Sequence, residues 1–182
     1  MMACSNNQGG VDNSQQSQAL DTAALMSQVQ DIYSSVFQVY EHTDFTKPSL
    51  ADDSSPLDSL TAHYCSSDWQ RCVTDVLARD ASQGDGMMGF FEADYWIMGQ
   101  DWQDLSVTDV NVKAMTDSTA TVELNLHNCG NVTCVCLEMV NDGGMWKIDN
   151  FIDATNQVDW KANMKEYLNQ EKNSTADNAT TK

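Results

Sequence analysis

A chain of 182 residues is long enough for one domain that buries its own hydrophobic core without a metal or disulfide bonds. Nine Lys and Arg residues against 27 Asp and Glu residues give a formal net charge of −18, which repels phosphate groups and makes nucleic acid a poor candidate partner. No apolar run approaches the roughly 18 residues that a membrane-spanning helix needs, so membrane contact is expected only through an attached lipid.

The N-terminal segment, residues 1–18, is predicted to be a flexible tether, because its Gln- and Ser-rich run has too little apolar surface to pack. Ala3 followed by Cys4 resembles the end of a bacterial lipoprotein signal peptide, in which the Cys becomes lipid-modified. The resemblance implies lipidation at Cys4 and a lipid-anchored protein of the cell envelope, periplasmic or extracellular. The alternative is a cytosolic protein with an ordinary N-terminal Cys.

Three helices are predicted after the tether. Asp21 is a suitable N-cap for a long first helix, in which apolar residues recur at helical spacing to about residue 43. The run Ser-Pro-Leu-Asp at 55–58 combines an N-cap, a proline at the first helical position and an acid three residues after the cap, which predicts a short second helix. A third helix begins at residues 67–70 and ends at the Gly-Asp-Gly of residues 84–86.

From residue 90 the apolar pattern becomes that of strands. Residues 90–98 are dense in aromatic and β-forming side chains, which predicts a strand covered on both faces. Residues 107–115 alternate between apolar and polar, with Val110, Val112 and Ala114 expected to face inward. A second strand is therefore predicted before the clearest pattern in the chain.

That pattern covers residues 119–153, where apolar and polar residues alternate and two turns rich in Asn, Asp and Gly interrupt them. It predicts a three-stranded antiparallel meander with one buried face. The residues expected on the buried face are Val122, Leu124, Leu126, Val135, Leu137 and Met139. Trp146 and Ile148 share that face, so Trp146 is predicted to be a core anchor whose truncation would cost about 3–5 kcal/mol.

The last predicted element is a helix over residues 158–170, followed by a polar and disordered tail at residues 171–182. Helices first, then strands, then a closing helix indicate an α+β fold. The expected architecture is a curved antiparallel sheet of about five strands wrapped round the long N-terminal helix, with a cavity between them. Residues 19–170 would form this single domain.

Two stretches of the chain, residues 94–102 and 146–153, together with the hairpins and the closing helix, resemble domain-of-unknown-function family 3828. The most specific features are the Gln100-Asp101 pair and the Trp-Lys-Ile-Asp strand. This family is similar to the cone-shaped folds of nuclear transport factor 2. The resemblance implies a cone with a pocket between helix and sheet, and it leaves the activity open.

The resemblance also implies where catalysis would occur, because some proteins with this cone fold are enzymes that use a buried Asp beside Tyr or His. A general acid or base needs a carboxyl group with a raised pKa and a hydrogen-bond partner. If the chain is an enzyme, Asp94, Asp101 and Tyr95 are the candidate catalytic residues. Asp149 and Asp153 are further acids near the expected mouth. We favour structural roles, such as caps and turn anchors, for all of these acids.

Four aromatic side chains are candidates for the lining of the ligand pocket. They are Tyr33, Tyr40, Trp96 and Trp102. Aromatic rings provide the apolar surface that small ligands contact, and a hydroxyl or indole N–H adds one polar group. Packing in the core or at its rim is the alternative role for such rings.

The Cys residues allow three interpretations. The weak candidates for a metal site lie on the outer face of one predicted hairpin and are His127, Cys129, Cys134 and Cys136. A disulfide bond from Cys129 to Cys134 or Cys136 is favoured for an exported protein, and Cys65 with Cys72 is a second candidate pair. The remaining interpretation is that all thiols are free. No cofactor is expected.

The favoured function is a non-enzymatic binding or scaffolding module of a bacterial envelope lipoprotein. Its pocket would take a small, partly apolar ligand, or its sheet would meet a protein partner, including a second copy of the chain. One alternative is a cone-fold enzyme that performs acid–base chemistry on a small molecule. Another is an immunity or inhibitor protein whose acidic surface binds a basic partner, in line with the charge of −18.

Overall fold

The computed structural model describes residues 13–45, 55–83 and 89–179, with side-chain environments for residues 21–45, 55–83 and 89–170. Cys4 and the first part of the predicted tether lie outside the described residues, as do the glycines predicted to end the third helix.

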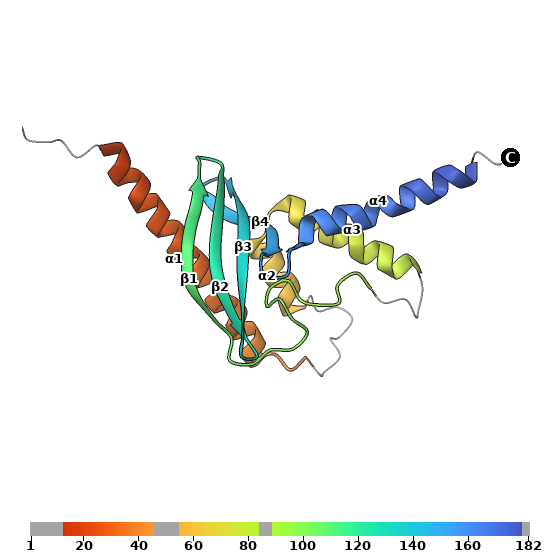
Figure 1. Cartoon of the computed structure of the whole chain (residues 1–182), viewed down its shortest axis with the longest axis horizontal. Helices are drawn as coiled ribbons and strands as arrows, with labels where there is room; N and C mark the ends of the chain where they lie inside the picture. Colours follow the sequence, from red (N-terminus) through yellow and green to blue (C-terminus); the bar gives the residue numbers. More distant parts are fainter. Residues whose placement is uncertain (1–12, 46–54, 84–88, 180–182) are drawn as a thin grey trace, which may run out of the picture.

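The described residues form an α+β fold of four helices and one five-stranded sheet (Figure 1), which confirms the predicted fold class. The helices are α1 (Asn13–His42), α2 (Pro56–Tyr64), α3 (Ser67–Gln83) and α4 (Trp160–Ala179). The strands are β1 (Ser106–Met115), β2 (Thr119–Asn128), β3 (Asn131–Asp142), β4 (Met145–Asp153) and β5 (Val158–Asp159).

Two helix boundaries differ from the prediction. Helix α1 begins at Asn13, so Asp21 lies inside the helix instead of capping it, and residues 13–18 of the predicted tether are helical. Helix α4 continues to Ala179, past the predicted end at residue 170 and into the predicted tail. Neither extension contains a Gly or a Pro, so the local sequence has no residue that stops a helix. None of the helices in the described residues is long and apolar enough to cross a bilayer.

The predicted start of α2 is confirmed in detail. The Ser55 side chain accepts a hydrogen bond from the Leu57 backbone N–H (3.3 Å), and the Ser55 backbone N–H donates to an Asp58 carboxylate oxygen (3.2 Å). Pro56 occupies the first helical position, where no N–H is needed. This capping box fixes where α2 begins, and it therefore fixes the position of Leu57 and Asp58 beside the cavity described below.

The meander is also confirmed, since the strand order is β1-β2-β3-β4-β5 and every neighbouring pair is antiparallel. Except for Trp146, the residues expected on the inward face of the meander are buried: Val122, Leu124, Leu126, Val135, Leu137, Met139 and Ile148. Helix α1 runs along this face of the sheet (Figure 1) and contributes its own buried stripe to the core, including Leu25, Val29, Ile32 and Val36.

Irregularities in the strands change which residues face the core. In β1 the register shifts between Val112 and Ala114, so Val110 is buried but Ala114 is exposed, contrary to the prediction. In β4 the register shifts at Asp149, which allows Phe151 to face the core with Ile148 although the two are three residues apart. A bulge inserts one residue into one strand and so reverses the alternation beyond it.

The predicted strand at residues 90–98 is wrong. This stretch is a loop of turns with a single isolated bridge between Asp94 and Gly99, and the fifth strand is the short β5 instead. Aromatic and β-branched residues favour strands mainly because strands offer half-buried surface, and the loop offers the same burial to Trp96 and Ile97. The loop packs against α3 and β4 through Tyr95, and it carries many of the residues that line the cavity described below.

Trp146 follows the predicted register, since it lies opposite Asn141 and two residues before Ile148. It is only half-buried, however, because it packs at the rim of the core, where its backbone carbonyl accepts a hydrogen bond from the Gln28 side chain (2.8 Å). The prediction of a fully buried core anchor is therefore wrong for Trp146, and Phe151 has that position in β4.

Candidate functional site

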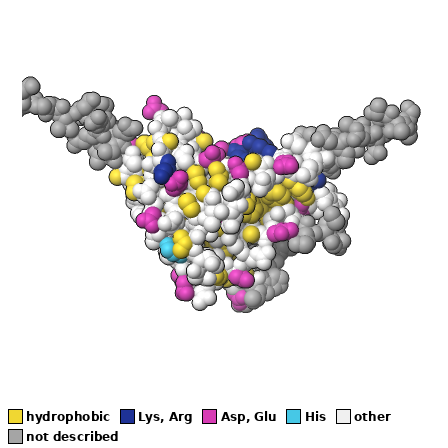
Figure 2. Space-filling model, in the orientation of Figure 1, with side chains coloured by type: hydrophobic (Ala, Val, Ile, Leu, Met, Phe, Trp, Pro, Cys, Tyr) yellow, Lys and Arg dark blue, Asp and Glu magenta, His cyan; other side chains and the backbone are white. Residues whose placement is uncertain are grey.

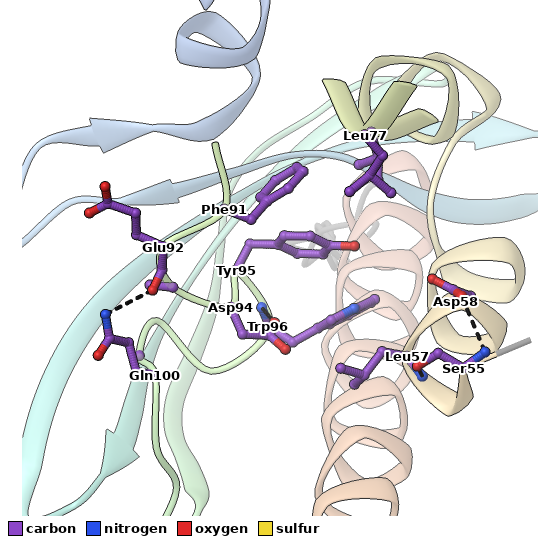
Figure 3. A pocket seen from close by; sticks show the side chains of 13 residues that line it. Ser55, Leu57, Asp58, Leu77, Phe91, Glu92, Asp94, Tyr95, Trp96 and Gln100 are labelled. Atoms are coloured by element: carbon purple, nitrogen blue, oxygen red, sulfur yellow. Dashed lines mark hydrogen bonds between the residues drawn. The ribbon is translucent and has the colours of Figure 1, made fainter. Parts of the chain in front are cut away.

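A cavity of about 380 Å³ lies between the start of α2, one face of α3 and the loop over residues 91–100. Figure 3 shows side chains from all three segments around it. Its apolar wall includes Leu57, Val73, Leu77, Phe91, Tyr95 and Trp96. Polar groups lie beside them, so the cavity combines apolar surface with a few hydrogen-bonding groups, as small-molecule sites do.

Asp94 determines the shape of the loop that forms one side of the cavity. Its backbone bridges to Gly99 in both directions, with N···O distances of 2.9 and 3.3 Å. Its carboxylate accepts a hydrogen bond from the Trp96 backbone N–H (2.8 Å), which is an Asx-type turn. These contacts hold Tyr95 and Trp96 in place along the wall.

The second carboxylate oxygen of Asp94 accepts a hydrogen bond from the hydroxyl of Tyr40, on α1. Burial raises the pKa of Asp94 above its ordinary value, although the hydrogen bonds from Tyr40 and Trp96 act in the opposite direction. Burial and the neighbouring Asp94 carboxyl raise the pKa of Tyr40 far above the usual value for tyrosine. The Tyr40 phenol therefore keeps its proton and donates a hydrogen bond to the Asp94 carboxyl group, whose own pKa is raised by burial.

Tyr95 is held by its hydroxyl and by its ring. Its hydroxyl lies 2.8 Å from Thr61 Oγ1, and Thr61 in turn donates to the Leu57 carbonyl, so Tyr95 is the donor in this chain. Its ring packs against Trp69 and Phe151, at centroid distances of 5.0 and 5.1 Å. Burial raises the pKa of Tyr95 well above its ordinary value. These contacts fix one ring of the cavity wall in a single orientation.

The structure separates the candidate pocket residues into three places. Trp96 lines the cavity, together with Asp94 and Tyr95. The second place is an aromatic cluster outside the cavity lining, formed by the rings of Tyr40, Phe45 and Trp102. Tyr40 reaches the cavity wall only through its hydrogen bond to Asp94, and Trp102 is 37% exposed.

The third place is the core. Tyr33 is fully buried there and packs against Phe37, and its hydroxyl has no hydrogen-bond partner among the described residues. Burial raises the pKa of Tyr33 well above its ordinary value. Tyr33 does not line the cavity.

The other candidate acids lie away from the cavity. Asp101 lines a separate polar hollow beside Asn128, whose side chain donates to the Asp101 carbonyl (2.9 Å). Asp153 is buried and accepts two hydrogen bonds from Asn156, which closes the turn after β4. Asp149 forms an ion pair with Lys161 (2.7 Å) and anchors α4. Asp149 and Asp153 thus have partners for their carboxylates in their own regions of the fold, whereas Asp101 is bound through its backbone carbonyl.

The predicted disulfide bonds are wrong for the cysteines that the structure describes, because all five have free thiols. Cys129 lies in the β2–β3 turn with a positive φ, while Cys134 and Cys136 lie opposite Asn125 and Glu123 on β2. Cys134 lies three residues along β3 from the end of the turn that holds Cys129, and at about 3.4 Å per residue this exceeds the Cα separation of about 4.4–6.8 Å that a disulfide bond requires.

The weak candidate metal ligands do not converge. Within the described ranges, no three His, Cys, Asp or Glu side chains are grouped so that they could hold a metal ion. The His127 ring instead contacts the hydroxyl of Thr108, with a distance of 3.0 Å between Nε2 and Oγ1. Cys129, Cys134 and Cys136 continue along the same hairpin without forming a ligand set with His127.

Sequence reasoning missed the contribution of α2 and α3 to the cavity. Leu57, Val73 and Leu77 belong to apolar helix stripes that are typical of core packing, but all three line the cavity and Leu77 is 50% exposed. One feature of the sequence could have indicated this wall of the cavity. The apolar stripe of α3 extends beyond its buried residues Trp69 and Val76 and includes Val73 and Leu77.

Comparisons of the chain with protein-family models, with curated protein sequences and with solved structures find no match. The resemblance to family 3828 and to nuclear transport factor 2 therefore stays a prediction.

Replacing Asp94 by Asn should remove part of the pH dependence of folding. Because the folded-state pKa of Asp94 is raised above 3.8, its contribution to stability is fully present below about pH 4 and is lost as the pH rises through the folded-state pKa. The free energy of unfolding of the natural protein, relative to Asp94→Asn, should therefore fall as the pH rises above about 4 in urea titrations. A difference that is constant over this range would contradict the raised pKa.

Proposed function

We propose that this protein is a non-enzymatic binding module of the bacterial cell envelope and that its cavity takes a small, partly apolar ligand. The observation that carries the proposal is the cavity of about 380 Å³ between α2, α3 and the loop over residues 91–100. Binding sites for small molecules are hollows of about 300–1,000 Å³ with apolar walls and a few polar groups. Leu77 is half-exposed beside this cavity, so its apolar surface is available to a ligand.

The hydrogen bonds around the cavity favour binding over acid–base catalysis. Both oxygens of the Asp94 carboxylate already accept hydrogen bonds, from Tyr40 and from the Trp96 backbone. Tyr95 already donates to Thr61. A general acid or base must reach a proton of the substrate directly or through one water, and these groups are committed to the protein instead.

An acid–base enzyme is the second candidate, and its support is the raised pKa of Asp94 beside Tyr40. The two candidates differ in what Asp94→Asn would change. For a binding module, the substitution should leave ligand affinity within a few-fold of the natural protein. A turnover of bound ligand that Asp94→Asn abolishes would favour the enzyme.

An inhibitor of a basic protein is a third candidate, supported by the net charge of −18. On the face shown in Figure 2, acidic side chains are spread over the surface and are not gathered in one patch. A tight inhibitor needs a concentrated interface with a buried centre. This distribution favours the cavity as the site of recognition.

Filling the cavity should weaken the binding of a neutral, partly apolar probe. We expect 4-phenylbutan-1-ol to shift the amide resonances of residues 91–100 saturably in the natural protein, and Leu77→Trp to reduce this affinity about tenfold by occupying the space. Met145→Trp is the control, because Met145 is also an exposed apolar residue, at 58% against 50% for Leu77, and lies outside the cavity. Shifts that do not saturate, or that are unaffected by Leu77→Trp, would exclude the cavity as the binding site.

The envelope location rests on Ala3 and Cys4, which lie outside the described residues. When the protein is expressed in a bacterial host with a signal peptide fused before Ala3, we expect it to partition into detergent, and Cys4→Ser to move it to the aqueous phase. Acyl chains attached at Cys4 would cause this partition, since each buried CH₂ contributes about 0.8 kcal/mol. Equal aqueous recovery of both proteins would reject the anchor.

A further inference from the structure

We propose that the cavity is selective for an organic cation, namely a protonated amine with an apolar body. This inference rests on the proposed function, because it names the ligand class of the same cavity. Three acids line the cavity: Asp58, Glu92 and Asp94. The described lining residues include no Lys, Arg or His. An anionic ligand would lose hydration there without gaining an opposite charge, whereas a cation would gain one.

The three acids are not equivalent, because Asp94 is already engaged. Both of its oxygens already accept hydrogen bonds, from the Tyr40 hydroxyl and from the Trp96 backbone N–H. Asp94 therefore positions the wall and is not the expected partner of a cation. The other two acids have accepting capacity left.

Among the described residues, Asp58 uses one carboxylate oxygen, as the acceptor of the Ser55 N–H. Figure 3 shows the other oxygen directed away from Ser55, on the side of the Tyr95 ring. The Glu92 carboxylate has no hydrogen bond or ion pair within the described part of the chain, and the Glu92 carbonyl accepts from Gln100 (2.9 Å). Both acids are exposed at the rim of the hollow. Figure 3 shows the Glu92 carboxylate directed away from the Phe91 and Tyr95 rings, so Asp58 is the nearer partner for a bound cation and Glu92 adds negative charge at the rim.

The aromatic wall adds a second attraction for a cation. The rings of Phe91, Tyr95 and Trp96 line the cavity, and Figure 3 shows those of Phe91 and Tyr95 side by side at its centre. A ring face attracts a positively charged group within about 6 Å, and the attraction grows when water is excluded. The apolar body of the ligand would contact Leu57 and Leu77. Aromatic and acidic groups together favour an amine over a neutral molecule of the same shape.

The charge of the whole chain does not by itself produce this selectivity. Acidic side chains spread over the surface attract any cation weakly, and salt screens that attraction beyond about 8 Å at physiological ionic strength. Selectivity at the cavity requires the particular carboxylates that line it. Changing one acid at the cavity must therefore have a larger effect than changing one elsewhere.

Three probes of similar shape test the inference: 4-phenylbutylamine, 4-phenylbutan-1-ol and 4-phenylbutyrate, which are cationic, neutral and anionic at pH 7. Affinities are measured on the full chain at 0.15 M salt from saturable amide shifts at the cavity. A carboxylate about 4 Å from an ammonium group at a partly exposed site supports a preference of about tenfold. We expect the amine to bind about tenfold tighter than the alcohol, and the butyrate to bind most weakly.

The variants separate the site from the general charge. Asp58→Asn with Glu92→Gln should bring the affinity for the amine down to that for the alcohol and leave the affinity for the alcohol unchanged. Glu166→Gln is the control, because Glu166 is exposed on α4 and lies outside the cavity. Glu92→Gln alone provides a second variant that keeps the capping box of α2 intact, and a thermal melt checks that each variant is folded.

The outcomes distinguish this inference from the proposed function. If the alcohol or the butyrate binds as tightly as the amine, the cation selectivity is overturned and the binding function stands. If Glu166→Gln weakens amine binding as much as the double variant does, the selectivity comes from general charge and the inference is again overturned. If none of the three probes gives saturable shifts at the cavity, the proposed function itself fails and the inference fails with it.

Discussion

Phe151→Ala should lower the free energy of unfolding by about 3–5 kcal/mol, a sizeable part of the roughly 5–15 kcal/mol that stabilises a domain. Phe151 is fully buried and lies at the centre of an aromatic cluster. Its ring centroid is 4.8 Å from Trp69, 5.1 Å from Tyr95 and 4.9 Å from Trp96. The ring therefore connects β4, α3 and the loop that lines the cavity, and removing it leaves a hole that three large and well-fixed neighbours are poorly able to fill.

Two further variants make this test specific, and all three are measured by urea unfolding. Phe151→Leu keeps most of the apolar volume and should cost less than about 1.5 kcal/mol. Trp146→Ala removes a larger side chain from the same strand, but Trp146 is only half-buried, so its truncation should cost clearly less than that of Phe151. If Trp146→Ala proved the more damaging of the two alanine variants, the assignment of Phe151 as the core residue of β4 would be wrong.

Lys161→Met should lower the free energy of unfolding by about 2–3 kcal/mol. The Lys161 side chain is 9% exposed, and its Nζ lies 2.7 Å from both Asp68 on α3 and Asp149 on β4. Asp149 also accepts a hydrogen bond from Ser66 (2.5 Å), and Ser66 caps α3 through the Trp69 backbone N–H. Removing one partner of a buried pair typically costs about 3–5 kcal/mol, but both acids here are partly exposed and water will replace part of the interaction.

The pH dependence identifies the ion pairs as the cause. The hydrogen bond from Lys161 lowers the pKa of Asp68 below its ordinary value of 3.8, against a smaller effect of burial. A lowered pKa contributes stability that is complete above the ordinary value and is lost as the pH falls through the folded-state value. The difference between the natural protein and Lys161→Met should therefore shrink below about pH 4.

At the alkaline end, burial lowers the pKa of Lys161, but its hydrogen bonds to Asp149 and Asp68 outweigh this, and the net pKa is raised above 10.5. The stability difference should thus stay constant up to about pH 9. Lys165→Met is the matched control on the same helix, because Lys165 is exposed and lies 3.9 Å from Asp68. It should change the stability by less than about 0.5 kcal/mol. Equal effects of the two substitutions would show that the buried position of Lys161 has no special importance.

The sequence by itself determines the features of this protein that depend on local spacing. Alternation at period two places Leu124 and Leu137 on one face, because successive side chains of a strand point to opposite sides. The Ser-Pro-Leu-Asp run at 55–58 determines the start of α2, because its capping groups bond to backbone groups within three residues. Each of these features depends on residues within one element or one hairpin. They can therefore be predicted from the sequence without knowing which other elements pack against them.

Only the tertiary structure decides the features that depend on partners far away in the chain. Residues 90–98 have the composition of a strand but form a loop, because Asp94 bonds to Tyr40, 54 residues earlier, and to the turn at Trp96. The bulge at Asp149 turns Phe151 inward, and Lys161 pairs with Asp149 from α4. The alternation of apolar and polar residues in β4 predicts neither the inward position of Phe151 nor the ion pair of Asp149.

The cavity also depends on contacts between segments that are far apart in the sequence. Its walls come from α2, α3 and the loop over residues 91–100, and each of these segments taken alone has an apolar pattern that indicates core packing. Whether Leu77 is covered or lines a hollow depends on the distance between elements that the chain joins through long connections. That distance is set by the packing of rings such as Trp69 and Phe151, and no local pattern encodes it.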